Sequence, residues 1–103
     1  MKVLYGCRDV TVDKNQPHIL KYSAEAGYTG VELHHDRCDI TANLALSRSD
    51  TYVGGGTTIA AIGQVVRLEL GEVLLHPGSM VHGGNPITAG TRYLMVTFAD
   101  LKR

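Results

Sequence analysis

The stretch Val31-Glu32-Leu33-His34-His35-Asp36 combines residues that favour a β-strand with side chains that can bind a metal ion. In an extended chain, His34 and Asp36 are two positions apart and project from the same face, where an imidazole and a carboxylate can bind one ion. Two ligands do not complete a site. The best candidate for a third ligand is His82, 46 positions after Asp36, so the site must be assembled from distant parts of the chain.

Short strand-forming segments recur on both sides of this stretch, separated by glycine and proline signals. This spacing is typical of an all-β sandwich or barrel, and eight strands suit a jelly roll. We therefore predict an all-β, cupin-like jelly roll with little or no helix. The expected strands cover residues 18–23, 30–36, 40–46, 57–62, 65–70, 72–76, 80–82 and 91–99.

The first 17 residues show no sustained helical period, and we interpret them as an N-terminal extension of one core domain, residues 18–103. A chain of 103 residues can bury only one core. Within the extension we expect a short strand near residues 3–5 and then loop, with at most a helical turn within residues 9–16.

Composition limits the function classes. Ten basic and ten acidic residues give zero formal net charge, so we expect neither nucleic-acid binding nor attraction to an acidic membrane. The N-terminus lacks the apolar core of a signal peptide, and no apolar run approaches the ~20 residues that span a bilayer. Cys7 and Cys38 match no zinc-finger spacing, so we expect reduced thiols and a cytoplasmic protein.

Two histidines and one carboxylate on one side of a metal ion, with the other side open, are the arrangement of non-haem Fe(II) centres. The competing interpretation is that residues 34–36 are a solvated strand end that binds no metal ion. His35 should point to the opposite face of the strand from His34. His76 is interpreted as a packed or turn-bonded histidine rather than a fourth ligand.

Arg92 stands in an otherwise apolar segment, and alternation places it on one face with Leu94, Val96 and Phe98. An unpaired guanidinium is very costly to bury, so Arg92 requires an anion. The carboxylate of a small bound acid would satisfy it with two parallel hydrogen bonds. The alternative is a structural salt bridge to one of the ten acidic residues.

From about Leu20 to the C-terminus, the sequence resembles the catalytic domain of 2-oxoglutarate- and Fe(II)-dependent oxygenases of the prolyl 4-hydroxylase and procollagen lysyl hydroxylase type. This resemblance implies a double-stranded β-helix fold. The matching segments occur in the family's order: Lys21-Tyr22-Ser23, His34-His35-Asp36, Ile40-Thr41-Ala42-Asn43-Leu44-Ala45-Leu46, Gly54-Gly55-Gly56-Thr57, Leu75-His76-Pro77-Gly78, Val81-His82 and Gly90-Thr91-Arg92-Tyr93.

The resemblance implies a role for each matching residue. It assigns His34, Asp36 and His82 as the iron ligands, and it pairs Arg92 with the distal carboxylate of 2-oxoglutarate. Tyr22 and Asn43 fall at positions of further co-substrate contacts. The implied cofactors are Fe(II), 2-oxoglutarate and O₂, with ascorbate as an optional reductant. The implied reaction hydroxylates an unactivated C–H bond, most often of a peptidyl prolyl or lysyl residue, and releases succinate and CO₂.

Several departures leave the substrate open between a peptide, a protein and a small molecule. Leu94 departs from the Arg-x-Ser pattern of some branches, and Arg92 replaces the lysine of collagen prolyl 4-hydroxylases. The family has helices and extra strands before the core, where this chain has 17 residues before His18. One sheet face would then lack a cover, so we expect a homo-oligomer or a larger parent protein. The alternatives are a cupin-like protein that binds zinc or manganese without 2-oxoglutarate, and a non-catalytic module that is a truncated remnant.

Overall fold

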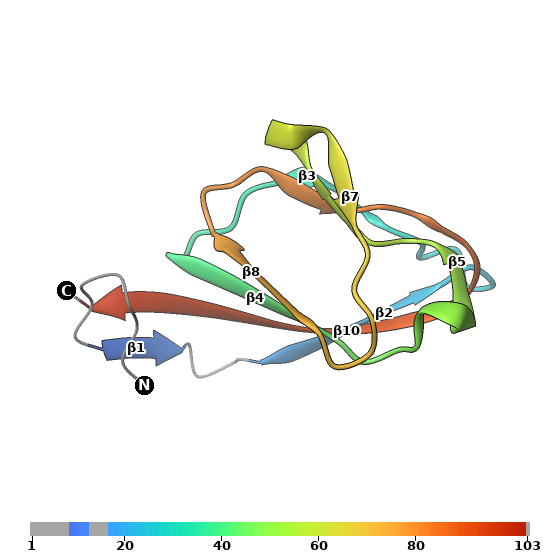
Figure 1. Ribbon diagram of the computed structural model, residues 1–103, viewed down its shortest axis with the longest axis horizontal. Helices are drawn as coiled ribbons and strands as arrows, with labels where there is room; N and C mark the ends of the chain where they lie inside the picture. Colours follow the sequence, from blue (N-terminus) through green and yellow to red (C-terminus); the bar gives the residue numbers. More distant parts are fainter. Residues whose placement is uncertain (1–8, 13–16, 103) are drawn as a thin grey trace.

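The computed structural model describes residues 9–12 and 17–102, which form two antiparallel sheets that face each other (Figure 1). Two short 3₁₀ helices, η1 (Ser49–Thr51) and η2 (Ala60–Ile62), interrupt the strands. The smaller sheet contains β3 (Val31–His34), β6 (Thr57–Ile59), β7 (Gln64–Val66) and β9 (His82–Gly84). The larger sheet contains β1 (Asp9–Val12), β2 (His18–Ser23), β4 (Ile40–Ala45), β5 (Tyr52–Gly54), β8 (Val73–Pro77) and β10 (Ile87–Lys102).

The connectivity confirms the predicted jelly roll. In the smaller sheet the strand order is β3-β9-β6-β7, and in the larger sheet β10 lies between β2 on one edge and β4 on the other, with β8 beyond β4. Along the chain from β2 to β4, and again from β7 to β10, consecutive strands alternate between the two sheets. This arrangement is the double-sheet architecture of the jelly roll.

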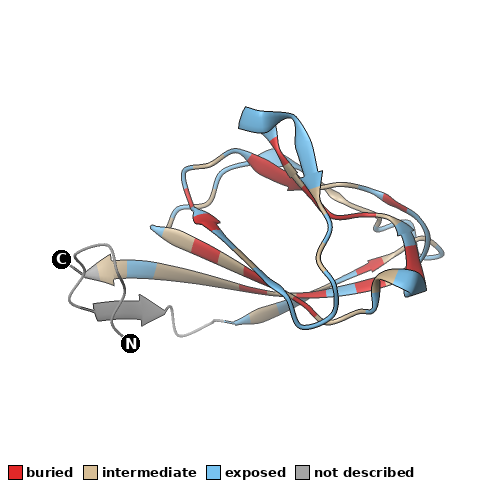
Figure 2. Ribbon diagram, in the orientation of Figure 1, coloured by how far each residue is buried: buried red, intermediate tan, exposed pale blue. Residues whose placement is uncertain are grey.

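The long strand β10 organises the larger sheet, because its two edges pair with four other strands. Its register places Arg92 opposite Tyr22, and Leu94 opposite both Leu20 and Ala45. The inward residues of these strands form the core between the sheets, whereas the η2–β7 hairpin is mostly exposed (Figure 2). The buried apolar cluster consists of Tyr22, Tyr52, Ile87, Leu94 and Val96.

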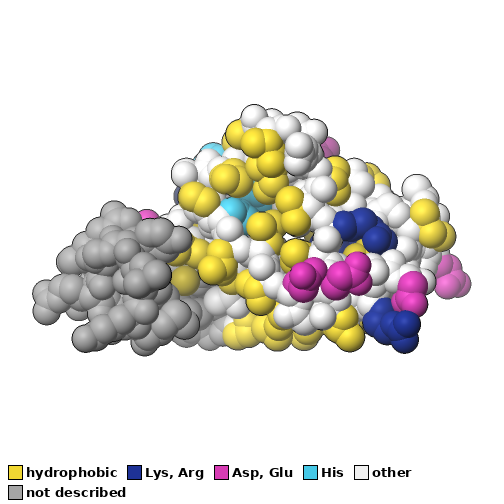
Figure 3. Space-filling view, viewed as in Figure 1, with side chains coloured by type: hydrophobic (Ala, Val, Ile, Leu, Met, Phe, Trp, Pro, Cys, Tyr) yellow, Lys and Arg dark blue, Asp and Glu magenta, His cyan; other side chains and the backbone are white. Residues whose placement is uncertain are grey.

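The outer face of the larger sheet is unusually apolar. On this face Met95 lies between Ile19 and Leu44 in the register, and Leu44 lies opposite Val73. Ile19 and Val73 are 60% and 52% exposed, and Leu75 on the same strand as Val73 is 63% exposed. Hydrophobic side chains also appear along the lower border of the molecule in Figure 3, below β10. An exposed apolar sheet face is unfavourable in water unless another surface covers it.

The structure has nine strands after residue 17 where eight were expected, because Tyr52–Gly54 pairs with the first residues of β10. The strand expected over residues 65–70 ends at Val66. There the Arg67 guanidinium turns back and donates hydrogen bonds to backbone carbonyls of Ser49, Tyr52 and Gly54, which replaces strand pairing with side-chain bonds.

Other boundaries also differ from the expectation, the largest extension being that of the strand expected over residues 91–99, which runs from Ile87 to Lys102. The strand expected over residues 57–62 ends at Ile59. The helix η2 follows and is capped by Gly63, whose φ of 61° lies in the left-handed region that glycine tolerates. The strand expected over residues 80–82 instead begins at His82 and continues to Gly84.

Residues 9–12 are a strand, not the loop or helical turn that we expected. They pair antiparallel with the end of β10, from Asp9 opposite Lys102 to Val12 opposite Ala99. The strand expected near residues 3–5 lies outside the described residues. Within the described ranges, no helix has the length and apolarity needed to cross a membrane.

Candidate functional site

The smaller sheet brings the three predicted metal ligands together. His34 ends β3, His82 begins β9, and the two residues are cross-strand partners. Asp36 follows two residues after β3 ends, so the expectation that one strand carries both His34 and Asp36 was wrong in its boundary. The loop is nevertheless fixed, because the Asp36 backbone N–H donates to the carbonyl of Gly78 over 2.8 Å.

Gly78 allows this approach. A Cβ at position 78 would collide with the carbonyl group of Cys38, so the loop after β3 can lie against the turn after β8 only when residue 78 is glycine. In this arrangement the Asp36 carboxylate lies between the two imidazoles. His34 Nε2 is 3.3 Å from Asp36 Oδ1, and His82 Nε2 is 3.2 Å from Asp36 Oδ2.

Both imidazoles are held in the tautomer that a metal site requires. Nδ1 of His34 lies 2.7 Å from the Glu32 carbonyl oxygen, and Nδ1 of His82 lies 2.8 Å from that of Met80. A carbonyl oxygen only accepts hydrogen bonds, so each Nδ1 carries a proton, and in the neutral imidazole each Nε2 then presents a lone pair. The ligand atoms of the three residues lie within 4.8 Å of one another. Two imidazole nitrogens and a carboxylate oxygen gathered this closely fit a divalent metal ion.

Burial lowers the pKa of His82, and neighbouring His76 lowers it further, whereas the hydrogen bond to the Met80 carbonyl and the charge of Asp36 act in the opposite direction. Burial is the largest of these effects, so His82 is held neutral. Neutral imidazole is the form that binds a metal ion.

The remaining histidines of residues 34–82 lie outside this group of ligands. His35 is exposed. His76 is buried, its Nδ1 lies 2.8 Å from the Pro77 carbonyl oxygen, and its ring packs 4.2 Å from the His82 ring. This geometry agrees with the interpretation of His76 as a packed, turn-bonded histidine. Its buried Nε2 has no hydrogen-bond partner among the described residues.

A cavity of about 220 Å³ lies between the two sheets and joins the metal ligands to the predicted co-substrate residues. Figure 3 shows histidine side chains set among hydrophobic ones on the face of the molecule turned to the viewer. All six residues singled out from the sequence line this cavity: Tyr22, His34, Asp36, Asn43, His82 and Arg92.

Arg92 is 4% exposed and has no carboxylate partner in the part of the chain that the structure describes. Its Nη1 reaches the Gly56 carbonyl oxygen only at 3.5 Å, which is a long contact. The guanidinium carbon lies 5.3 Å and 5.9 Å from the ring centres of Tyr22 and Tyr52. The structural salt bridge proposed as an alternative is therefore not found among these residues.

Two further polar groups face the same cavity. Asn43 Nδ2 is buried and has no hydrogen-bond partner within the described ranges. Tyr22 stacks on Tyr28 with ring centres 5.5 Å apart. Burial raises the pKa of Tyr22, and the charge of Arg92 opposes this rise, so the phenol stays protonated and can donate a hydrogen bond. Together with Arg92, these groups are donors suited to an anionic ligand.

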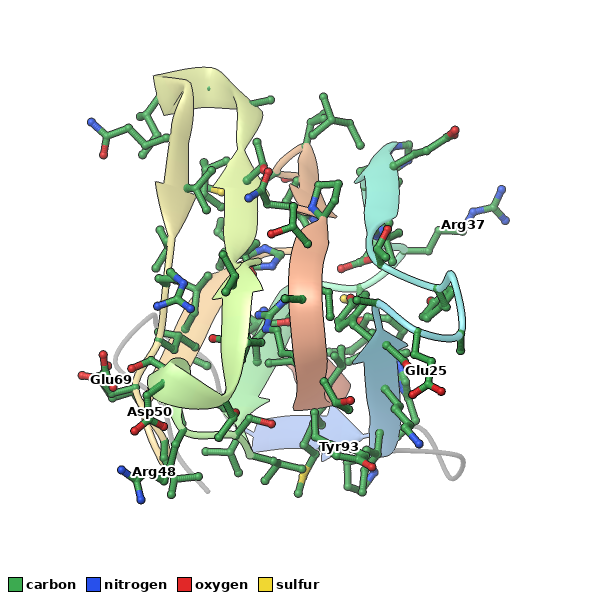
Figure 4. All side chains as sticks on the ribbon, turned by 90° about the vertical axis from the view of Figure 1, so that its right-hand side faces the viewer. Glu25, Arg37, Arg48, Asp50, Glu69 and Tyr93 are labelled. Atoms are coloured by element: carbon green, nitrogen blue, oxygen red, sulfur yellow. The ribbon has the colours of Figure 1, made fainter. Side chains whose placement is uncertain are left out.

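Sequence reasoning missed Thr41. Its hydroxyl Oγ1 donates a hydrogen bond to Asp36 Oδ2 over 2.7 Å. The available signal was its place on the same face of the strand as Asn43, two positions away. The charged side chains labelled in Figure 4 lie instead on the periphery, where Arg48 pairs with Asp50 and Arg37 extends away from the sheets.

Comparison with known proteins shows a partial similarity to procollagen lysyl hydroxylases. The chain is 44% identical over 71 residues to procollagen-lysine,2-oxoglutarate 5-dioxygenase 1 of Mus musculus, which is 65% of this chain and 10% of that protein. It is 42% identical, with the same coverage, to the multifunctional procollagen lysine hydroxylase and glycosyltransferase of Homo sapiens. The matched region is thus about a tenth of the length of these relatives.

No protein-family model matches the chain. Among solved structures, an RmlC-like cupin protein from Desulfovibrio desulfuricans is similar with a TM-score of 0.47 and 14% sequence identity, over 94% of this chain and 96% of that one. The relationship that these comparisons support is therefore a partial one, to one stretch of the lysyl hydroxylases.

Proposed function

We propose that this chain forms a 2-oxoglutarate- and Fe(II)-dependent oxygenase domain that hydroxylates an unactivated C–H bond, with a peptidyl lysyl or prolyl residue as its substrate. The observation that carries the proposal is the position of Arg92. Its buried guanidinium has no carboxylate partner among the described residues and lines the same cavity as His34, Asp36 and His82. A dicarboxylic acid could bind the metal ion at one end of this cavity and pair with the Arg92 guanidinium at the other end.

Each part of the site then has a defined task. The two imidazoles and the Asp36 carboxylate hold the ion from one side, and Arg92 binds the distal carboxylate of 2-oxoglutarate with two parallel hydrogen bonds. Asn43 Nδ2 and the Tyr22 hydroxyl supply further hydrogen-bond donors to the co-substrate. The apolar part of the cavity lining includes Leu20, Leu94, Val96 and Phe98. Fe(II) with 2-oxoglutarate and O₂ supplies the oxidising power, and succinate and CO₂ are the co-products.

The relatives support the same chemistry. The names of both lysyl hydroxylases describe lysine hydroxylation in procollagen, and one names 2-oxoglutarate. Because the chain matches only about a tenth of their length, a peptidyl substrate is proposed for this chain rather than transferred from them.

The competing function is a cupin-like module that binds zinc or manganese through the same three ligands and performs no 2-oxoglutarate chemistry. The ligand atoms alone are compatible with this alternative, because imidazole and carboxylate bind several divalent metals. Arg92 separates the two functions, since a module without an anionic co-substrate has no need for a buried cation beside its metal.

An anaerobic titration with Fe(II), with and without 2-oxoglutarate, tests the proposal. The oxygenase should develop a visible charge-transfer band only when both are present, and admission of air should then yield succinate, with ascorbate tested as an additive. Stoichiometric Fe(II) binding with neither band nor succinate would favour the module. Collagen-like peptides that contain lysine or proline would then be assayed for a mass increase of one oxygen atom.

A further inference from the structure

Thr41 is held rigidly beside the candidate metal centre. It is 1% exposed and lies in the middle of the larger sheet, opposite Phe98 of β10 on one side and His76 of β8 on the other. Neighbouring strands on both sides leave the side chain little freedom to move. Its position relative to Asp36 is therefore set by the sheet and not by a mobile loop.

The Thr41 hydroxyl has one proton, and the structure directs it to one oxygen of the carboxylate. Oγ1 lies 2.7 Å from Asp36 Oδ2, the distance of a strong hydrogen bond to an anion. The Cys38 thiol lies 3.3 Å from the same Oγ1 and also donates to the Ile40 carbonyl oxygen over 3.4 Å. The second carboxylate oxygen, Oδ1, lies beside His34 Nε2 at 3.3 Å and accepts no bond from Thr41.

A carboxylate can bind a metal ion through one oxygen or through both. A short hydrogen bond to one oxygen makes the two oxygens unequal, because that oxygen then has less charge to offer a metal ion than the other. We propose that Thr41 is a positioning residue whose hydroxyl makes Asp36 bind the metal ion through a single oxygen. This role concerns the ligand and not the reacting atoms.

The consequence rests on the proposed function. A co-substrate that chelates through its keto-acid end needs two adjacent positions on the metal, and O₂ needs another. If Asp36 bound through both oxygens, it would take one of these open positions. Thr41 would thus preserve the open side of the centre on which oxygenase chemistry depends.

The test compares variants of the full chain. Thr41→Val removes the hydroxyl at nearly constant volume, and Thr41→Ser retains it. Thr97→Val is the matched control, because Thr97 is half-buried on β10, opposite Ala42 on the outer face of the same sheet. The measurements are thermal unfolding with chelator present, Co(II) affinity with the visible spectrum of bound Co(II), and 2-oxoglutarate affinity of the Fe(II)-loaded protein.

We expect Thr41→Val to bind Co(II) about 10–100-fold more weakly than wild type, the range found for outer-shell partners of metal ligands. The intensity of its Co(II) bands should change, because these bands depend on coordination number. Thr41→Ser and Thr97→Val should match wild type in both readouts. If Thr41→Val does not fold, as judged by circular dichroism, Thr41→Ala takes its place, because a smaller side chain creates no clash.

Wild-type affinity and an unchanged Co(II) spectrum in the Val or Ala variant would overturn the role of Thr41. An equal loss in Thr41→Ser would also overturn it, since the hydroxyl would then be irrelevant. The 2-oxoglutarate measurement is separate. If wild type fails to bind 2-oxoglutarate but the Co(II) results hold, then the proposed function fails and the positioning role remains.

Discussion

Nε2 of His82 lies 3.2 Å from Oδ2 of Asp36, and in the neutral imidazole whose Nδ1 donates to Met80 neither of these two atoms carries a proton. The same relationship holds between Nε2 of His34 and Oδ1 of Asp36 at 3.3 Å. Without metal and with both imidazoles neutral, lone pairs face one another, and this arrangement is a local electrostatic cost. With a divalent cation bound, the same lone pairs become the ligands.

Each of the variants His34→Ala, Asp36→Ala and His82→Ala should lose stoichiometric Fe(II) binding, because a facial site that lacks one ligand holds its metal poorly. His35→Ala is the control and should retain the metal, since His35 is exposed and does not line the cavity. Metal content after equilibrium dialysis measures both. Full retention of iron in His82→Ala would mean that another residue is the third ligand. His76 would then be tested first by substitution, because its buried Nε2 has no hydrogen-bond partner in the described chain.

Asp36→Asn should separate stability from function. The amide nitrogen can donate to a histidine Nε2, so the variant without metal should be more stable than wild type by about 1 kcal/mol, the net value of a hydrogen bond. Metal binding should fall sharply because the anionic ligand is lost. Denaturant unfolding at pH 8 in chelator measures the first effect. A variant less stable than wild type under these conditions would show that the three side chains do not repel one another in the apo protein.

Tyr22 should make stability decrease at alkaline pH. Burial raises its pKa above the ordinary value of 10.0, so above pH 10 the unfolded chain loses this proton before the folded protein does. Stability is therefore complete below that pH and falls as pH rises towards the folded pKa. Ultraviolet titration of tyrosinate should show a late component that Tyr22→Phe removes. Tyr93→Phe, at an exposed position, should leave that component in place.

The outer face of the larger sheet should bind a second copy of the chain or another protein. Ile19 and Leu75 expose 60% and 63% of their surface on this face, and a large apolar patch is unfavourable in water. Sedimentation should therefore detect self-association that decreases in Ile19→Lys and Leu75→Lys. Ile62→Lys, at a 59% exposed position on η2, is the control and should behave as wild type. A wild-type monomer at high concentration that binds no hydrophobic dye would contradict this expectation.

Alternation along the sequence predicted the part of the site that lies on regular strand. In β10 it correctly placed Arg92 on the same cavity face as Leu94, Val96 and Phe98. Local pairing rules cannot show which strand lies opposite, so the contact of Arg92 with Tyr52 across the fold required the structure. Tyr52–Gly54 was missed as a strand because three residues beside a glycine triplet carry too little pattern.

Strand β4 shows why burial cannot be inferred from hydrophobicity alone. Its large residues Ile40 and Leu44 alternate with Thr41 and Asn43, and the smaller polar residues are the buried ones. The reason is that the inner face of β4 lines the cavity that contains the candidate metal ligands, while the apolar residues face outward. Thr41 was therefore overlooked, although this buried threonine donates a hydrogen bond to the Asp36 carboxylate.

The most direct test of the account is the affinity for 2-oxoglutarate in the Fe(II)-loaded protein, measured by anaerobic titration in wild type, Arg92→Lys and Arg92→Ala, with metal content checked in parallel. We predict that Arg92→Lys weakens the co-substrate and retains the metal, because an ammonium cannot form two parallel hydrogen bonds to a carboxylate. Arg92→Ala should weaken binding further, by roughly 2–5 kcal/mol, the cost of losing one partner of a buried charge pair. Unchanged affinity in metal-loaded Arg92→Ala would contradict the account, because Arg92 would then not bind the co-substrate.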